Sequence, residues 1–218
     1  MADIYYCQFL GDHWGPWEGG DMMPPIPGDF DPEATTITVA SRDGNDWCHA
    51  YDPVAGLLTW CIWEGDGWSD WYDFASLAVP PNWLIDDEEA YFSVGARLGT
   101  QWLYSYNAED GSIYYSAWVG DGYSDWEGPF FVEDEAPNMA DETDVFFAGD
   151  SESEWIISVN PEDWSVFFAA WEGDGFGPWE QGPDLFIPEE WHDYGIDLDG
   201  DARDGAMWIY ATVYDSED

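Results

Sequence analysis

The sequence predicts an all-β protein, a four-bladed β-propeller with four antiparallel strands in each blade. Three observations support this prediction: a repeat of 53 to 55 residues, aromatic and β-branched runs of strand length inside each repeat, and chain ends that each carry half of a repeat. Because the repeats fill the chain, we expect a single domain over residues 1–218.

The repeat is clearest in a nine-residue motif that begins and ends on an aromatic residue. It reads WEGDGWSDW at 63–71, WVGDGYSDW at 118–126 and WEGDGFGPW at 171–179, and a fourth copy, FLGDHWGPW, covers 9–17. The last tryptophan falls at 17, 71, 126 and 179, so the successive spacings are 54, 55 and 53 residues. A unit of about 50 residues has the length of one propeller blade.

Short apolar runs inside each repeat predict four strands. A second tryptophan recurs at 47, 102, 155 and 208, each time among aromatic and β-branched residues. In the repeat at 31–83 we expect strands at 36–41, 47–51, 57–63 and 68–74, joined by short polar turns. No apolar stripe of helical period occurs, and Pro and Gly interrupt the chain every few residues, so we expect no long helix.

The two chain ends predict how the ring closes. The chain begins with the third and fourth strands of a repeat, at 4–10 and 14–17, and ends with the first and second, at 194–198 and 207–214. Residues 1–30 plus 192–218 then form one repeat, beside those at 31–83, 84–139 and 140–191. Pairing of the N-terminal with the C-terminal strands closes the ring and leaves no open edge. A domain-swapped dimer with eight blades is the alternative.

The charge predicts a salt-adapted protein. Forty-eight acidic residues against three basic ones give a net charge of -45, yet 45% of the residues are hydrophobic, which is not typical of a disordered chain. Molar salt shortens the Debye length to about 3 Å and removes most of the self-repulsion. An acidic mimic of nucleic acid would gather its carboxylates on one face, whereas here they occur in every repeat. Binding to nucleic acid needs clustered Lys and Arg, which the chain lacks.

The sequence contains no basic stretch followed by an apolar run at its N-terminus, and no apolar run as long as a membrane span. We therefore expect neither a classical secretion signal nor membrane insertion, and the location stays open between a high-salt cytoplasm, a cell surface and a virion. Cys7, Cys48 and Cys61 make no disulfide framework, and we expect them to be small core residues.

Four segments of the repeat at 31–83 carry a family resemblance: ITVASR at 37–42, Trp47, GLLTW at 56–60 and GWSDW at 67–71. They resemble the repeat of bacterial PLL-type propeller lectins, which are similar to tachylectin and fucose lectins, and the likeness extends over essentially the whole chain. The resemblance implies binding of sugars, often fucose-like or O-methylated, in clefts between blades, without metal or catalysis. This chain departs from it in having four units rather than seven, and in lacking Ser-Asp at 15–16 and 177–178.

All three arginines, Arg42, Arg97 and Arg203, stand five residues before the recurring tryptophan of their repeats, where the remaining repeat has Asp150. In a structural interpretation each guanidinium stacks on a tryptophan or pairs with a carboxylate of the next blade. In a functional one it donates to a sugar hydroxyl or an anionic ligand in the cleft between blades.

The repeats also place one aromatic ring each at the expected start of the fourth strand, either as a platform for a sugar or as packing between blades. These rings are Trp14, Trp68, Tyr123 and Phe176.

Acidic residues near the C-terminus offer a candidate site for Ca²⁺, because they alternate along what the sequence predicts to be a turn. They are Asp197, Asp199, Asp201 and Asp204. Asp201 also falls at an inner-strand position where the other repeats have Ala40, Gly95 and Ala148, so we expect it to face water or an ion. No other cofactor is expected.

Catalysis is not expected. The chain shows no Ser-His-Asp order, phosphate-binding loop or zinc-ligand spacing, and among so many carboxylates no glycosidase pair stands out. The leading hypothesis is a non-enzymatic, lectin-like propeller of a halophile that binds a glycan or surface polysaccharide through several sites. The alternative is a structural or docking component of a halophilic virus particle or surface assembly that binds protein instead of glycan.

Overall fold

The computed structural model describes residues 2–31, 35–42, 45–72, 75–82, 90–97, 100–107, 110–120, 122–132, 136–137, 143–149, 154–173, 175–191, 194–203 and 206–214. Within these ranges it leaves out the side chains of Ala2, Arg42, Ala75, Ala90, Ala96, Arg97 and Arg203.

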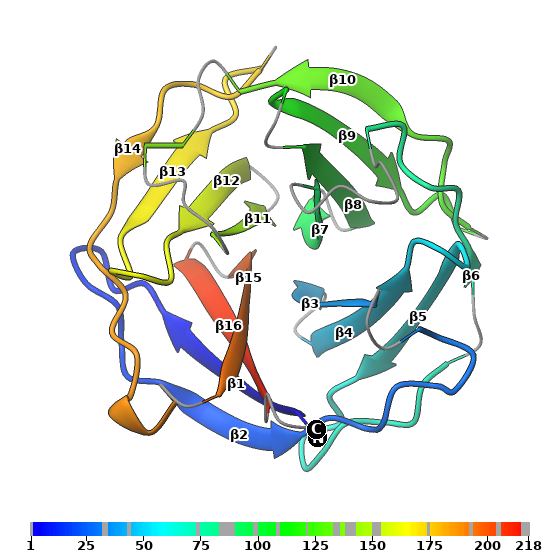
Figure 1. Ribbon diagram of the computed structural model, residues 1–218, viewed down its shortest axis with the longest axis horizontal. Helices are drawn as coiled ribbons and strands as arrows, with labels where there is room; N and C mark the ends of the chain where they lie inside the picture. The colour runs from blue at the N-terminus through cyan, green and yellow to red at the C-terminus, as the bar shows by residue number, and fades with distance from the viewer. Residues whose placement is uncertain are drawn as a thin grey trace.

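Strands in the described residues form four antiparallel sheets of four, arranged as blades around one axis (Figure 1). The first blade contains β3 (Thr36–Arg42), β4 (Asn45–Asp52), β5 (Leu57–Ile62) and β6 (Ala75–Ser76). The second contains β7 (Ala90–Arg97), β8 (Thr100–Asn107), β9 (Ser112–Ala117) and β10 (Glu127–Phe131). The third contains β11 (Asp144–Gly149), β12 (Glu154–Val159), β13 (Val166–Ala170) and β14 (Glu180–Gln181), followed by the 3-10 turn η1 (Glu189–Trp191).

The fourth or closing blade joins the two ends of the chain. It contains β15 (Gly195–Arg203), β16 (Ala206–Tyr214), β1 (Ala2–Gln8) and β2 (Glu18–Met22), in that order from the axis outward. β1 pairs with β16 along its whole length, from Ala2 opposite Tyr214 to Gln8 opposite Trp208. The predicted four-bladed propeller is confirmed, and the ring closes within a single chain.

The fourth strand of each blade begins later than the sequence predicted. It was expected at 14–17 and 68–74, but β2 covers 18–22 and β6 covers 75–76. The motif aromatics form only one isolated bridge, such as Trp63 with Trp68, and the chain then leaves the sheet. Its path is held at a few points, such as the bond from Tyr72 N to Trp60 O (2.8 Å), before regular pairing resumes. The aromatic residues that suggested a strand therefore form a wide turn.

The last tryptophan of each motif connects its blade to the preceding one. Trp126 Nε1 donates to Ala78 O (2.7 Å), in the segment that leaves the first blade. Trp71 and Trp17 make the same kind of bond to backbone carbonyls of the closing and third blades, at 2.9 and 2.6 Å. All four, including Trp179, are partly buried against apolar clusters.

At the axis, the inner strands β3, β7, β11 and β15 contact one another and bury one side chain each at the same repeat position. Two of these side chains accept a backbone N–H from the next blade: Thr38 Oγ1 from Val94 (3.1 Å) and Ser93 Oγ from Phe147 (3.1 Å). Asp199 does the same for the first blade. These bonds satisfy inner-strand amides that would otherwise be buried without an acceptor.

Cys7, Cys48 and Cys61 are free thiols with at most 1% of their surface exposed, so they are core residues as predicted. Burial raises the pKa of Cys7 to about 12, which keeps this thiol protonated and unreactive.

Among the described residues, no helix is long and apolar enough to cross a membrane.

Candidate functional sites between the blades

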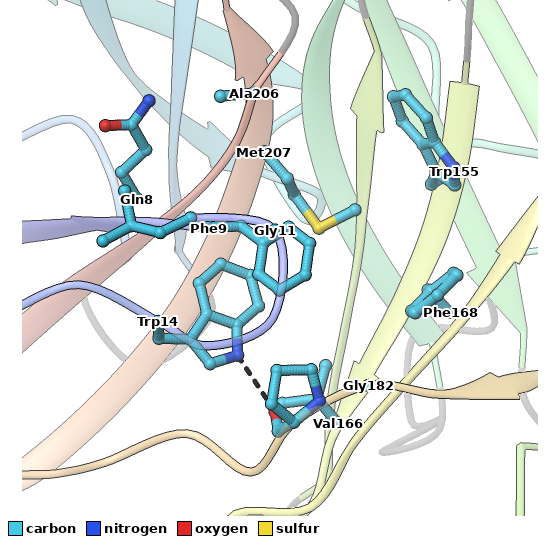
Figure 2. A pocket seen from close by; sticks show the side chains of 12 residues that line it. Gln8, Phe9, Gly11, Trp14, Trp155, Val166, Phe168, Gly182, Ala206 and Met207 are labelled. Carbon is cyan, nitrogen blue, oxygen red and sulfur yellow. Dashed lines mark hydrogen bonds between the residues drawn. The ribbon is translucent and has the colours of Figure 1, made fainter.

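Two successive interfaces of the ring contain a cavity, and both involve the closing blade. The first cavity, here called the apolar cleft, lies between the third blade and the closing blade and has a volume of about 570 Å³. Figure 2 shows Phe9, Trp14 and Met207 of the closing blade across from Trp155 and Phe168 of the third blade. Trp14 is fixed by a bond from its Nε1 to Pro183 O (3.0 Å), drawn as the dashed line in Figure 2.

The second cavity, here called the acidic cleft, lies between the closing blade and the first blade and has a volume of about 260 Å³. Two indoles of the first blade, Trp63 and Trp68, meet edge to face at 5.6 Å. The remaining lining side chains, from both blades, are Ile4, Tyr6, Asp21, Asp46 and Tyr210.

The two clefts are built from the same positions of the repeat, but their chemistry differs. Each is bordered by the first and the sixth residue of the nine-residue motif, both aromatic, and by the residue before the recurring tryptophan. At almost every paired position the apolar cleft has an apolar side chain where the acidic cleft has a polar or larger one. The pairs, with the apolar cleft first, are Met207 and Asp46, Phe9 and Trp63, Phe168 and Tyr6, and Pro183 and Asp21.

Described side chains meet across the interface between the first and second blades. Trp60 and Trp118 approach edge to face at 6.2 Å between ring centroids. Below them, Gln101 Nε2 lies 3.1 Å from His49 Nε2, and the hydroxyl of Tyr123 donates to Gln101 Oε1 (3.3 Å). Tyr123, a predicted ligand-binding ring, is thus used in contacts at this interface.

Aromatic rings meet across the interface between the second and third blades. Phe130 packs edge to face against Trp171 at 5.6 Å, and Tyr104 stacks on Phe147 at 4.4 Å. Phe176 is only 6% exposed, so its ring is a core ring here. Of the four predicted aromatic platforms, the structure places Trp14 and Trp68 in the lining of cavities, Phe176 in the core and Tyr123 partly buried against an apolar cluster.

The predicted arginine ligands cannot be placed through their side chains, because those of Arg42, Arg97 and Arg203 lie outside the described residues, as does Asp150. Their backbones end the inner strands. Arg203 pairs with Ala206, which lines the apolar cleft, and Arg42 pairs with Asn45, the neighbour of an acidic-cleft residue. A role for these arginines in ligand binding stays a prediction.

The acidic segment near the C-terminus is a strand and not the turn that the sequence indicated. Asp197, Asp199 and Asp201 all lie within β15, and Asp204 falls outside the described residues. Asp201 is fully buried, and its carboxylate accepts the backbone N–H of Ser41. The expectation that Asp201 faces water is therefore wrong. Asp197 and Asp199 line an axial cavity of about 200 Å³, but the described residues contain no group of three ligands placed to hold a metal ion.

Sequence reasoning missed the residues that give each cleft its character, Asp46 and Asp21 in one and Met207 in the other. A signal was present, because the residue before the recurring tryptophan differs in every repeat although the tryptophan itself does not. These four residues are Asp46, Gln101, Glu154 and Met207. A variable position next to an invariant one within a single chain is typical of a site that has been adapted separately in each copy.

No protein-family model matches the sequence, and no curated protein sequence matches it. Among solved structures, the chain is similar to an arginine-to-alanine triple mutant of AofleA from Arthrobotrys oligospora, with 16% sequence identity and a TM-score of 0.45. The match covers 99% of this chain and 59% of the AofleA chain, so this chain spans about three fifths of that protein's length.

Proposed function

We propose that the protein binds carbohydrate, without catalysis, in the two clefts that border its closing blade. The observation that carries the proposal is the recurrence of one construction: a recessed cavity between two blades with a motif tryptophan, Trp14 or Trp68, in its wall. Flat aromatic rings suit the C–H face of a sugar, and nearby polar groups suit its hydroxyls. The resemblance of the repeat to propeller lectins supports the same function.

The position of the clefts suits multivalent binding. Both include residues at or beside the turn between the first and second strands of a blade and the turn between the third and fourth, and both extend along the strands of the neighbouring blade. The two clefts lie at adjacent interfaces of one ring. Two shallow sites on one rigid disc bind a repeating polysaccharide more tightly than either site alone.

A glycan array tests the proposal, run in about 1 M salt, at which exposed charges are largely screened. We expect selective binding by the wild type and weaker binding by Trp14→Ala and Trp68→Ala. Tyr123→Ala is the matched control, since Tyr123 holds the same repeat position and its hydroxyl is hydrogen-bonded to Gln101 of its own blade. Circular dichroism verifies that each variant is folded. A blank array with an intact fold would overturn the proposal.

A second candidate function, docking to a protein partner, is favoured by exposed apolar side chains on the outer rim. Phe186, Met22 and Phe131 are 75%, 59% and 53% exposed. Met22 and Phe131 lie on the outer strands of two different blades, and Phe186 follows the outer strand of a third, which is why carbohydrate binding comes first. If the array is blank, a Phe186→Ser variant should lose a partner that the wild-type protein captures.

We further propose that the protein is adapted to high salt. With a net charge of -45, the folded ring is opposed by repulsion that acts over about 10 Å at 0.1 M salt but only about 3 Å at 1 M. Transfer from molar potassium chloride to dilute buffer should therefore lower the melting temperature steeply. Sucrose at equal osmolarity is the control, because it screens no charge. A melting temperature that does not depend on salt would contradict this interpretation of the composition.

A further inference from the structure

The acidic cleft contains a carboxylate that is held in place by hydroxyl donors. Asp46 Oδ1 accepts hydrogen bonds from Ser41 Oγ (2.5 Å) and from the hydroxyl of Tyr210 (3.2 Å), and these two hydroxyls lie 2.8 Å from each other. Asp46 belongs to β4 of the first blade, whereas Tyr210 lies on β16 of the closing blade. The network therefore fixes a negative charge at the junction of the two blades.

A second carboxylate lines the same cavity from the opposite blade. Asp21 lies on β2, the outer strand of the closing blade, and is exposed to solvent. The cavity thus has one fixed carboxylate in its inner part and one toward the outside. Both favour a ligand with a positive charge over a neutral or anionic one.

Aromatic rings form much of the remaining wall. Trp63, Trp68, Tyr6 and Tyr210 all line the cavity. The faces of such rings attract cations, and organic ammonium groups are bound in proteins by aromatic side chains combined with carboxylates. A hydrated inorganic ion gains little from these rings, so the lining indicates an ammonium group attached to a carbon skeleton.

From these observations we propose that the acidic cleft binds an amino sugar with a free, protonated amine. The ammonium group lies between the carboxylates and the aromatic rings. The proposal rests on the carbohydrate-binding function above and assigns it a substrate class at one cleft. The apolar cleft lacks both carboxylates at the paired positions, because Met207 and Pro183 stand there, so it does not share this preference.

Isothermal titration calorimetry of the full chain tests the proposal with glucosamine, N-acetylglucosamine, glucose and methylammonium. The titrations run in high salt at about pH 6, where an amine with the pKa of an α-amino group is protonated. We expect glucosamine to bind about tenfold or more tightly than the other three, which corresponds to one charge-assisted contact. Acetylation removes the charge, and methylammonium lacks the hydroxyls.

Variants locate the site. Asp46→Asn and Asp21→Asn should each reduce the preference for glucosamine over glucose severalfold, and Asp21→Asn tests this even if Asp46→Asn perturbs the fold, because Asp21 is exposed. Glu180→Gln, on the exposed outer strand of the third blade, removes the same charge far from the cleft and should change nothing. Unchanged preference in both aspartate variants would overturn the proposal.

The outcomes separate this inference from the broader function. Equal binding of glucosamine, glucose and N-acetylglucosamine would overturn the amino-sugar specificity and leave carbohydrate binding intact. Equal binding of methylammonium and glucosamine would show a general cation site and would also overturn it. No binding of any sugar here, together with a blank glycan array, would overturn both.

Discussion

The closing blade contacts its two neighbours in different ways. Toward the third blade the contact is mainly apolar: one cluster of thirteen buried side chains extends across both blades, and the cavity beside it is the apolar cleft. Toward the first blade the corresponding cluster has only six buried members, and side-chain hydrogen bonds cross the interface. They run from Thr38, Val39 and Ser41 to Asp199 and Asp201, and from Tyr210 to Asp46.

The difference shows how a ring of near-identical repeats acquires distinct sites. Asp199 and Asp201, on the inner strand β15, accept backbone N–H groups of the first blade. Toward the first blade, these hydrogen bonds take the place of apolar contact. On the other side, the ring of Phe146 packs directly against Gly200. Phe146 has no side-chain oxygen that could accept the backbone N–H of Gly200, and this N–H donates instead to Asp199 Oδ1 (2.8 Å). The apolar cleft follows the apolar interface, and the acidic cleft follows the hydrogen-bonded one.

The largest effect should come from filling the space at Gly200. A Cβ at this position would lie 2.4 Å and 2.8 Å from two ring carbons of Phe146, which is itself 2% exposed. Gly200→Ala should therefore destabilise the protein by about 3 kcal/mol, the upper range for overpacking a well-filled core. Denaturant unfolding in high salt measures this change.

Two further variants check the cause. Adding Phe146→Ala to Gly200→Ala should cost less than the sum of the two single changes, because the clash disappears. Gly28→Ala is the control, since a Cβ there meets nothing within 4 Å. A Gly200→Ala protein as stable as the wild type would refute the idea that this interface depends on close approach.

The next effect concerns the hydrogen-bonded interface. Asp201 is fully buried and accepts the backbone N–H of Ser41, so Asp201→Ala leaves this amide buried without that acceptor. We expect a loss of about 2 kcal/mol, the usual cost of such an orphaned group. Asp201→Asn keeps one acceptor oxygen and should retain most of the stability. Equal losses in the two variants would show that the negative charge, and not the hydrogen bond, matters at this position.

Much of the fold could be predicted from the sequence, because the evidence for it is repeated four times. The nine-residue motif and the recurring tryptophan fix the blade length, and the half-repeats at the chain ends fix the closure. The start of each outer strand was predicted too early. Trp68 and its equivalents are aromatic residues, which favour strands, but here they lie in a wide turn, and local propensity does not separate the two structures.

The sites were less predictable. Trp14 and Trp68 line cavities, but nothing local in the sequence distinguishes them from Tyr123 and Phe176, which occupy the same repeat positions. The surroundings of each ring depend on side chains contributed by the neighbouring blade, such as Trp60 against Trp118. Asp199 and Asp201 looked like parts of a cation-binding turn because their long-range partners on β3 are about 160 residues away in the chain.

The smallest effect is a change in pH dependence at Asp199. Burial raises the pKa of this carboxyl well above its usual range, although donors from Gly200, Ser93 and Val39 oppose the shift. A carboxyl whose pKa is higher in the folded than in the unfolded state stabilises the fold most at low pH. Its contribution is present below the unfolded pKa of about 3.9 and is lost as the pH rises through the folded value.

Replacing Asp199 by asparagine removes this titration while keeping an acceptor oxygen for the amide of Val39. Above about pH 4, the stability of the wild type should therefore fall with increasing pH relative to that of Asp199→Asn, when both are unfolded by denaturant at one fixed high salt concentration. Glu180→Gln removes an exposed carboxylate of the third blade and controls for the general loss of charge. Parallel stability curves for wild type and Asp199→Asn would mean that the donors around Asp199 compensate its burial fully. The hydrogen-bonded interface would then carry a charged carboxylate at no cost, and its contrast with the apolar interface would lie in geometry alone.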